Sequence, residues 1–364
     1  MTLPQGFVEE SDKLDARLVI DANPLDADVI CGRLPEINAA GDLRALVVAL
    51  RRLLPDERAV AEYRFDECLA AMRDLGMLIG SVKRHGIEPC SVVPEAVPVL
   101  QALGRRTSMV PRDTVHHYTR WNPTGQRCRM YVGDPQERIL QDSVRLVFPH
   151  MVAALDLCAD LSGIEPWDPE FPVLLAEVTE RAATMIEAMD MVTSGVTPEF
   201  FARVLRPYFE EVTVGDEILL GPAAAQVPLW LVDLAVWASD RGEPEYAKFL
   251  AESVPYSLPR WRDYYDTWLL PPSLVTRLVH ALEHPPEVPE ARAVVDESAR
   301  RVAELLRTIV IFRGRHHAMA RKTYHIDLRL YERGSGGADV SLLTQILGLT
   351  RQAAAAVRPG ARTH

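Results

Sequence analysis

An arginine and a histidine follow an apolar stripe in the segment 290–324. The stripe repeats apolar residues at steps of three and four, which places them on one face of a helix; they are Val295, Ala299, Val302, Leu306 and Ile309. The same face then carries Arg313 and His316. A core-facing arginine requires an anion, and a core-facing imidazole requires a hydrogen bond or a metal ion. His316 is therefore a candidate metal ligand. The alternatives are an ordinary core histidine, or a helix end that emerges into solvent.

A second histidine, His317, is a rival ligand because it is the next residue along the chain. Successive helical residues are rotated by about 100°, so His317 points away from the apolar stripe. This difference favours His316 over His317.

A Gly-Ser-Gly-Gly sequence at 334–337 follows the histidine segment. Glycine permits positive φ angles and a close approach of the backbone to a ligand. Such a loop can enclose a small molecule and offer a hydroxyl group and amides to a carboxylate. Loops that only join two helices also have this composition, so the sequence of this loop alone does not distinguish a ligand-binding loop from a connecting one.

Helical periodicity dominates the rest of the chain and predicts an all-α fold. The segments that we expect to be helical are 42–54, 65–82, 141–161, 174–194, 225–239, 243–253, 272–283, 289–324 and 340–357. Pro149 lies inside one of these segments, where we expect it to kink or break the helix.

Prolines in residues 87–112 indicate the boundary between two parts of the chain. We expect an N-terminal helical portion at 1–105 and a larger C-terminal domain at 106–364.

Composition excludes several classes of partner. The net charge is −11 over 364 residues, which disfavours nucleic acid and anionic membranes because both attract basic surfaces. We find no transmembrane segment and no secretory signal in the sequence. The five cysteines are scattered and never spaced as CxxC, which argues against disulfides and a zinc site. We therefore expect a cytoplasmic protein with reduced thiols.

Several short motifs, in the same order along the chain, resemble the monodechloroaminopyrrolnitrin synthase family within the indoleamine/tryptophan 2,3-dioxygenase haem superfamily. One is the order Phe312-Arg313-x-x-His316-x-x-Met319-x-x-Lys322, with the 334–337 loop after it. The others are AAMRDLG (70–76), GSVKRHG (80–86), WNPT (121–124) and LGP (220–222).

The resemblance implies an indoleamine 2,3-dioxygenase-like helical fold that holds haem b between helices of the larger C-terminal part. His316 matches the proximal ligand of the haem iron, and Arg313 matches an arginine that meets a haem propionate. The implied co-substrate is dioxygen.

The resemblance also implies substrate-binding residues for an aromatic amino acid. Phe201 and Arg206 match an element that offers a ring to the indole and a guanidinium to the carboxylate. Ser335 and Gly336 lie in the loop that faces the amino-acid part of the substrate, and Tyr324 matches a tyrosine beside the substrate. The distal pocket is expected near 113–121 and 141–152, where the available polar residues are His116, His117, Tyr118, Ser143 and His150.

Two departures from the family pattern lie on the substrate side. Ala338 stands where the family has an aromatic residue, and the segment 327–333 differs from its counterpart. These departures leave open which tryptophan derivative is used.

We therefore expect a haem-dependent oxygenase that acts on tryptophan or a substituted tryptophan, including a chlorinated one, and rearranges the indole to an aminophenyl-pyrrole product. The alternatives are a dioxygenase that cleaves the indole ring and a haem-binding helical protein without turnover. An electron donor, the oligomeric state and the exact product are left open.

Overall fold

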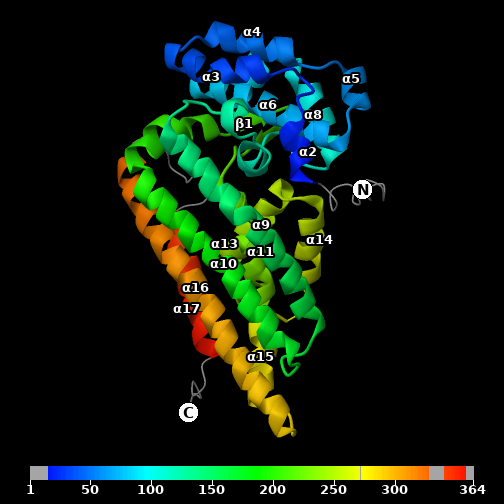
Figure 1. The fold of residues 1–364 in the computed structure, drawn as a ribbon, viewed down its shortest axis with the longest axis vertical. Coiled ribbons are helices and arrows are strands. Elements are labelled where there is room, and N and C mark those ends of the chain that lie inside the picture. The colour runs from blue at the N-terminus through cyan, green and yellow to red at the C-terminus, as the bar shows by residue number, and fades with distance from the viewer. Residues whose placement is uncertain (1–14, 271, 328–339, 358–364) are drawn as a thin grey trace.

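The computed structural model describes residues 15–270, 272–327 and 340–357. Long helices run side by side along the molecule, and shorter N-terminal helices cover one end of them (Figure 1). The all-α prediction is confirmed. Within the described residues, the sheet consists of one antiparallel hairpin of β1 (Val212–Val214) and β2 (Glu217–Leu219). Gly215, at φ 64°, occupies the turn between the two strands.

The N-terminal helices pack around the central helix α6, which α2, α4 and α8 contact. Their bounds are α2 (Ala16–Asp21), α3 (Asp28–Ala40), α4 (Leu43–Leu53), α5 (Glu57–Glu62), α6 (Phe65–Arg84), α7 (Pro89–Val92) and α8 (Ala96–Thr107). The segment 87–112, expected as a boundary, thus contains two packed helices. It is helical because Val99, Leu100 and Leu103 give α8 an apolar face that is buried.

Helix α6 is buried on all sides between residues 68 and 82, whereas its sequence indicated an amphipathic helix. Its charged residues tolerate burial because they are paired. Arg73 donates to Asp74, and Asp74 also accepts from Arg129. Burial of a charge is costly unless it is paired and hydrogen-bonded.

The C-terminal part is built from long helices and short π- and 3-10 segments. Their bounds are η1 (His116–Arg120), η2 (Gly125–Arg127), α9 (Pro135–Gly163), α10 (Glu170–Gly195), η3 (Phe200–Leu205), η4 (Arg206–Phe209), η5 (Ala224–Gln226), α11 (Leu229–Asp233), η6 (Leu234–Ala238), α12 (Ser239–Arg241), α13 (Pro244–Ser253), η7 (Val254–Tyr256), α14 (Pro259–Trp268), α15 (Leu274–Glu283), α16 (Pro289–Asp327) and α17 (Val340–Ala356).

Two segments differ from the sequence-based expectation. Helix α9 continues through Pro149, because helices α10 and α11 pack along it and its buried residues lie on both sides of the proline. The segment 225–239 is not one helix. It is divided among η5, α11, η6 and α12, and the π-helix η6 is buried throughout.

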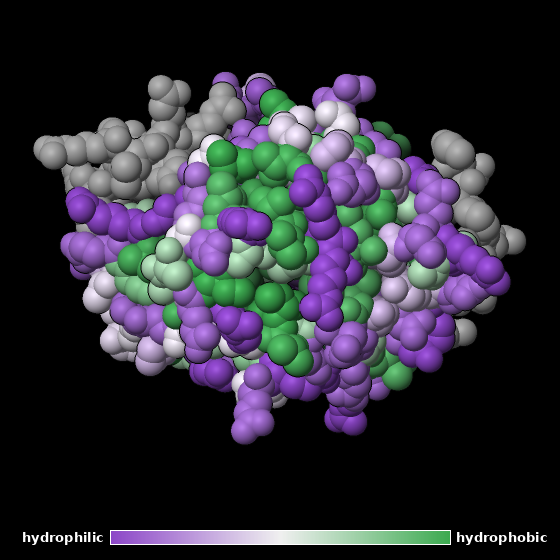
Figure 2. Space-filling model, turned by 90° about the horizontal axis from the view of Figure 1, so that it is seen from above, coloured by the Kyte–Doolittle hydropathy of each residue, from purple (hydrophilic) through white to green (hydrophobic). Residues whose placement is uncertain are grey.

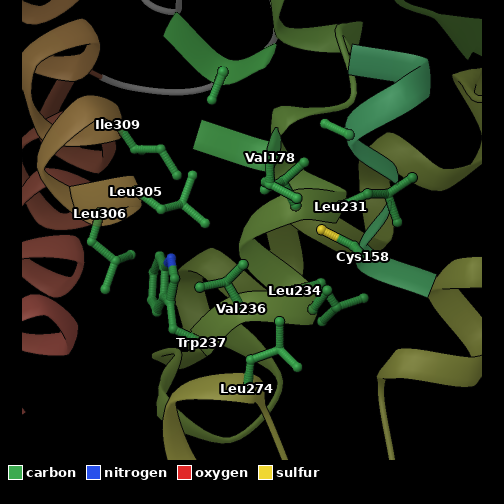
Figure 3. Close-up of a cluster of buried hydrophobic side chains, with 14 of the residues drawn as sticks. Cys158, Val178, Leu231, Leu234, Val236, Trp237, Leu274, Leu305, Leu306 and Ile309 are labelled. Atoms are coloured by element: carbon green, nitrogen blue, oxygen red, sulfur yellow. The ribbon is translucent and has the colours of Figure 1, made fainter. Parts of the chain in front are cut away.

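Helix α16 buries the apolar stripe that its sequence predicts. Val295, Ala299, Val302, Leu306 and Ile309 are at most 2% exposed. Each fully buried aliphatic side chain contributes roughly 1.5–3 kcal/mol, so the stripe fixes which face of α16 points inward. Figure 3 shows Leu305 and Leu306 beside Trp237 and Val236 of η6.

Two core clusters extend over the molecule. One is formed mainly by α9–α11 and α14–α17, and the other joins the N-terminal helices to η3, η4 and the hairpin. Because residues beyond 106 belong to both clusters, the division at 105/106 stays a prediction.

The outer face of the N-terminal helices carries a cluster of apolar atoms surrounded by polar ones (Figure 2). Val29 of α3 and Val48 of α4 are among the exposed apolar residues of the chain. None of the helices in the described ranges is long and apolar enough to cross a membrane. The five cysteines are buried and free.

Candidate functional site

The inward face of α16 ends in Arg313 and His316. Arg313 is buried, and His316 is half-buried. The Phe312 ring stacks on the His316 ring, with centroids 5.8 Å apart and planes at 17°. The imidazole is therefore held on an apolar surface at the end of the core stripe.

His316 is a neutral imidazole at ordinary pH. Part of the side chain is exposed, but the surrounding protein removes water from the ring, and this desolvation lowers the pKa of His316 to about 4. The charges of Arg313 and His317 lower the pKa further. Only the neutral ring has a free nitrogen lone pair for a metal, so the electrostatics suit a ligand.

His317 faces helix α17 instead. Its Nε2 lies 3.0 Å from the Thr344 hydroxyl, so one ring nitrogen is already engaged in a hydrogen bond. A ligand role for His317 would require this contact to break. Among the residues that the structure describes, no comparable hydrogen bond to the His316 ring is found.

The anion that the buried Arg313 requires is Asp233, at the end of α11. The guanidinium donates to the Asp233 carboxylate through Nη2 and to the Thr350 hydroxyl of α17 through Nη1. Burial alone would lower the pKa of Arg313, but the Asp233 charge outweighs it and leaves the pKa raised. Arg313 is thus a permanent buried cation one turn before His316.

Asp233 is fully buried and receives two further hydrogen bonds. Trp237 Nε1 donates to Oδ1 over 2.9 Å, and the Tyr246 hydroxyl donates to Oδ2. Burial beside this carboxylate raises the pKa of Tyr246 well above its ordinary value, so the phenol keeps its proton. No spacing pattern in the sequence marks Asp233 or Tyr246, because both meet Arg313 only through tertiary packing.

The predicted substrate residues are in part described. Phe201 in η3 is half-buried, and Arg206 at the start of η4 is buried. Phe201 and Met319 of α16 pack against the same core cluster, so the structure brings η3 near the histidine-bearing end of α16. The Tyr324 side chain and the loop residues Ser335 and Gly336 lie outside the described residues, as does Ala338.

The predicted distal segment is the π-helix η1. Its residues His116, His117 and Tyr118 are buried, and the Tyr118 hydroxyl donates to Glu137 over 2.8 Å. Burial lowers the pKa of His117 to about 3, with a further contribution from Arg73.

Two other predicted distal residues lie on α9. Ser143 is buried and donates to the Leu140 carbonyl, whereas His150 is half-buried.

A single segment connects the two sides of the candidate site. The Val115 N–H, directly before η1, donates to Gln226 Oε1 over 2.7 Å. From Gln226 the chain continues through α11 to Asp233, the partner of Arg313. This segment therefore contacts both the start of η1 and the guanidinium of Arg313 on α16.

Arg112 holds the neighbouring backbone in place. It donates to the carbonyls of Glu210 and Leu219, each over 2.6 Å, and so joins the two chain segments at the open end of the hairpin.

The donor set fits a haem better than a bare metal ion. In the described ranges there is no group of three or more His, Cys, Asp or Glu side chains that could hold an ion. A porphyrin supplies four nitrogens itself and needs only an axial ligand from the protein. One neutral imidazole, with a buried cation one turn away for an acidic substituent, meets that requirement.

Comparison with known protein families gives one match over nearly the whole chain. A family model described as monodechloroaminopyrrolnitrin synthase PrnB matches residues 18–364.

Proposed function

The chain belongs to the monodechloroaminopyrrolnitrin synthase family, and on this premise we propose how its own residues hold the haem and the substrate. The family consists of haem-dependent enzymes of the indoleamine/tryptophan 2,3-dioxygenase superfamily. It converts a chlorinated tryptophan to monodechloroaminopyrrolnitrin in pyrrolnitrin biosynthesis. The predicted enzyme class, fold and reaction are thereby confirmed.

His316 is the proposed proximal ligand of haem b. The observation that carries this assignment is a neutral, half-buried imidazole at the end of the buried stripe of α16, with Arg313 one turn before it. Bound haem would supply the iron chemistry that makes dioxygen a co-substrate. The contact of His317 with Thr344 supports the choice between the two histidines.

Arg313 is the proposed partner of a haem propionate. Each terminal nitrogen of a guanidinium carries two hydrogens, and Asp233 and Thr350 each accept from one terminal nitrogen. The N–H groups that Asp233, Thr350 and Tyr246 do not occupy would be donors for a second anion, while Asp233 keeps the guanidinium in place.

Arg206 and Phe201 are the proposed contacts for the substrate carboxylate and ring. A guanidinium can pair with a carboxylate through two parallel hydrogen bonds, which fixes orientation. Tyr324, Ser335 and Gly336 complete this proposal from the family resemblance. The function of these residues is to hold the amino-acid end so that the indole is presented in one orientation.

The identity of the product tests the reaction. We expect haem-loaded, reduced protein, given a chlorinated L-tryptophan and air, to form the aminophenyl-pyrrole product, detected by its mass. An N-formylkynurenine product would instead support indole-ring cleavage. A purified protein that takes up no haem would contradict both enzymatic functions.

The ligand assignment is tested by His316→Ala, with His317→Ala as the matched control. We expect His316→Ala to lose haem, measured as the Soret absorbance per protein chain, and His317→Ala to keep it. The reverse result would transfer the ligand role to His317.

The carboxylate contact is tested by Arg206→Leu. Loss of a charged hydrogen bond is worth about 1.5–3 kcal/mol, so we expect substrate binding to weaken by about ten- to a hundredfold. The haem spectrum of the free enzyme should be unchanged. Haem loss in this variant would contradict the proposed role.

A further inference from the structure

Two of the short motifs that carry the family resemblance supply glycines to one turn of the chain. Gly80 belongs to the GSVKRHG motif of α6, and Gly221 is the middle residue of the LGP motif after β2. A Cβ atom on Gly80 would lie 2.8 Å from the Tyr208 carbonyl oxygen, and one on Gly221 would lie 2.5 Å from the Phe209 carbonyl oxygen. A Cβ atom does not come this close to a backbone oxygen, so both positions require glycine.

The next carbonyl group along the chain is held by a side chain. The buried Arg112 donates through Nη2 to the Glu210 carbonyl over 2.6 Å. The carbonyl groups of three consecutive residues, 208–210, therefore lie against Gly80, Gly221 and the Arg112 guanidinium, in that order. We call Gly80, Arg112 and Gly221 the η4 clamp. Because the clamp contacts three consecutive carbonyl groups, η4 cannot shift towards α6 or β2 without a clash, nor away without losing a hydrogen bond.

The side chains of η4 are fixed by aromatic packing. The Tyr208 ring stacks on the Tyr131 ring, with centroids 4.4 Å apart and planes at 21°, and the Phe209 ring meets Tyr131 edge-on at 5.9 Å. Tyr131 itself ends at Gly80, where a Cβ atom would lie 2.5 Å from the phenol oxygen. The position of η4 is therefore set through its backbone and through its side chains.

We propose that the η4 clamp positions the Arg206 guanidinium for the carboxylate of the substrate. This role rests on the proposed function, which assigns the carboxylate contact to Arg206. Arg206 is the first residue of η4, and η3, directly before it, contacts α16. The clamp therefore acts on a turn that is continuous with the segment beside the histidine-bearing helix. A hydrogen bond weakens steeply as its angle departs from linear, so a small displacement of η4 weakens a charged contact that depends on orientation.

The test compares L-tryptophan with tryptamine, which lacks only the carboxylate. Dissociation constants of the haem-loaded protein for both ligands are measured by isothermal titration calorimetry. A charged hydrogen bond corresponds to about ten- to a hundredfold in affinity, so the wild type should favour tryptophan by about that ratio. Gly80→Ala and Gly221→Ala should each reduce the ratio by about threefold or more and leave the affinity for tryptamine unchanged. A general loss of structure would weaken both ligands alike.

Arg112→Lys is a third variant that adds no atom to the packed turn. Lysine keeps a positive charge beside Asp113, whose Oδ1 lies 3.7 Å from Arg112 Nε, but it lacks the planar group that reaches two carbonyls at once. We expect the same selective loss of tryptophan binding in this variant.

Gly32→Ala is the matched control. Gly32 lies in α3, where a Cβ atom would meet nothing within 4 Å, so the ratio should stay that of the wild type. Circular dichroism and the Soret spectrum show whether each variant is folded and loaded with haem. Folded clamp variants that keep the wild-type ratio overturn the role of the clamp and leave the Arg206 contact standing. Loss of the fold in all three also overturns it, because the clamp would then hold the domain rather than the turn. A wild type that binds both ligands equally overturns the Arg206 contact itself, and with it the role of the clamp.

Discussion

Two buried polar groups, one around Asp233 and one around His116, differ in how completely their hydrogen bonds are formed. In the Asp233 group, the carboxylate accepts from Trp237, Tyr246 and Arg313, and Arg313 also reaches Thr350. In the second group, the His116 cluster of His116, His117 and Trp121, four buried nitrogens have no partner within the described residues. A completed network holds one geometry, whereas unpaired buried atoms leave capacity for a ligand. The first therefore holds the histidine-bearing end of α16 in one position, whereas the second leaves its nitrogens unsatisfied.

Breaking the Asp233 group should have the largest effect. Asp233→Leu leaves Arg313 as an unpaired buried cation, which costs about 3–5 kcal/mol of unfolding free energy. Urea unfolding should show this loss, and the haem content should fall with it. A variant of wild-type stability would show that Arg313 does not depend on Asp233, and the contrast between the two groups would be lost.

Acid should act on two neutral histidines: His316, one turn after Arg313 of the Asp233 group, and His117 of the His116 cluster. The folded-state pKa values of His316 and His117 are lowered to about 4 and about 3 from an ordinary value of 6.5. Below pH 6.5 the unfolded chain therefore binds more protons than the folded one, so stability should fall as the pH decreases from about 6.5 towards 3. Urea unfolding at several pH values measures this slope. His117→Leu should flatten it, because the variant lacks one of the histidines that the folded protein keeps neutral.

A smaller change in the Asp233 group removes one hydrogen bond. Tyr246→Phe should lower the unfolding free energy by about 1 kcal/mol, because Asp233 keeps its bonds to Trp237 and Arg313. The Soret maximum should stay in place. A loss as large as that of Asp233→Leu would mean that Tyr246 contributes more than its hydroxyl.

The smallest effect on stability is expected in the His116 cluster. His116→Phe removes two unpaired buried nitrogens and forms no new cavity of consequence, so the ligand-free protein should be as stable as the wild type or slightly more stable. Thermal unfolding without substrate measures this. A marked loss of stability would show that His116 already has partners in the folded protein.

Much of the fold followed from periodicity. The stripe from Val295 to Ile309 predicted both the helix and its buried face, because apolar residues at helical spacing have one way to leave water. The division of 225–239 into short elements could not be predicted in this way. Its residues are apolar except for Gln226, Asp233 and Ser239, so periodicity does not indicate where the hydrogen-bonding pattern changes from α to π.

Residue types at short spacings were enough to predict the family, and they made His316 and Arg313 the candidates for the haem site. The anion that meets Arg313, the contact of His317 with Thr344 and the unpaired nitrogens of His116 and Trp121 became known from the folded chain alone. Those facts depend on contacts between residues far apart in the chain. Hydrogen bonds of this kind form only once packing has excluded water and set the distances, so no local pattern specifies them.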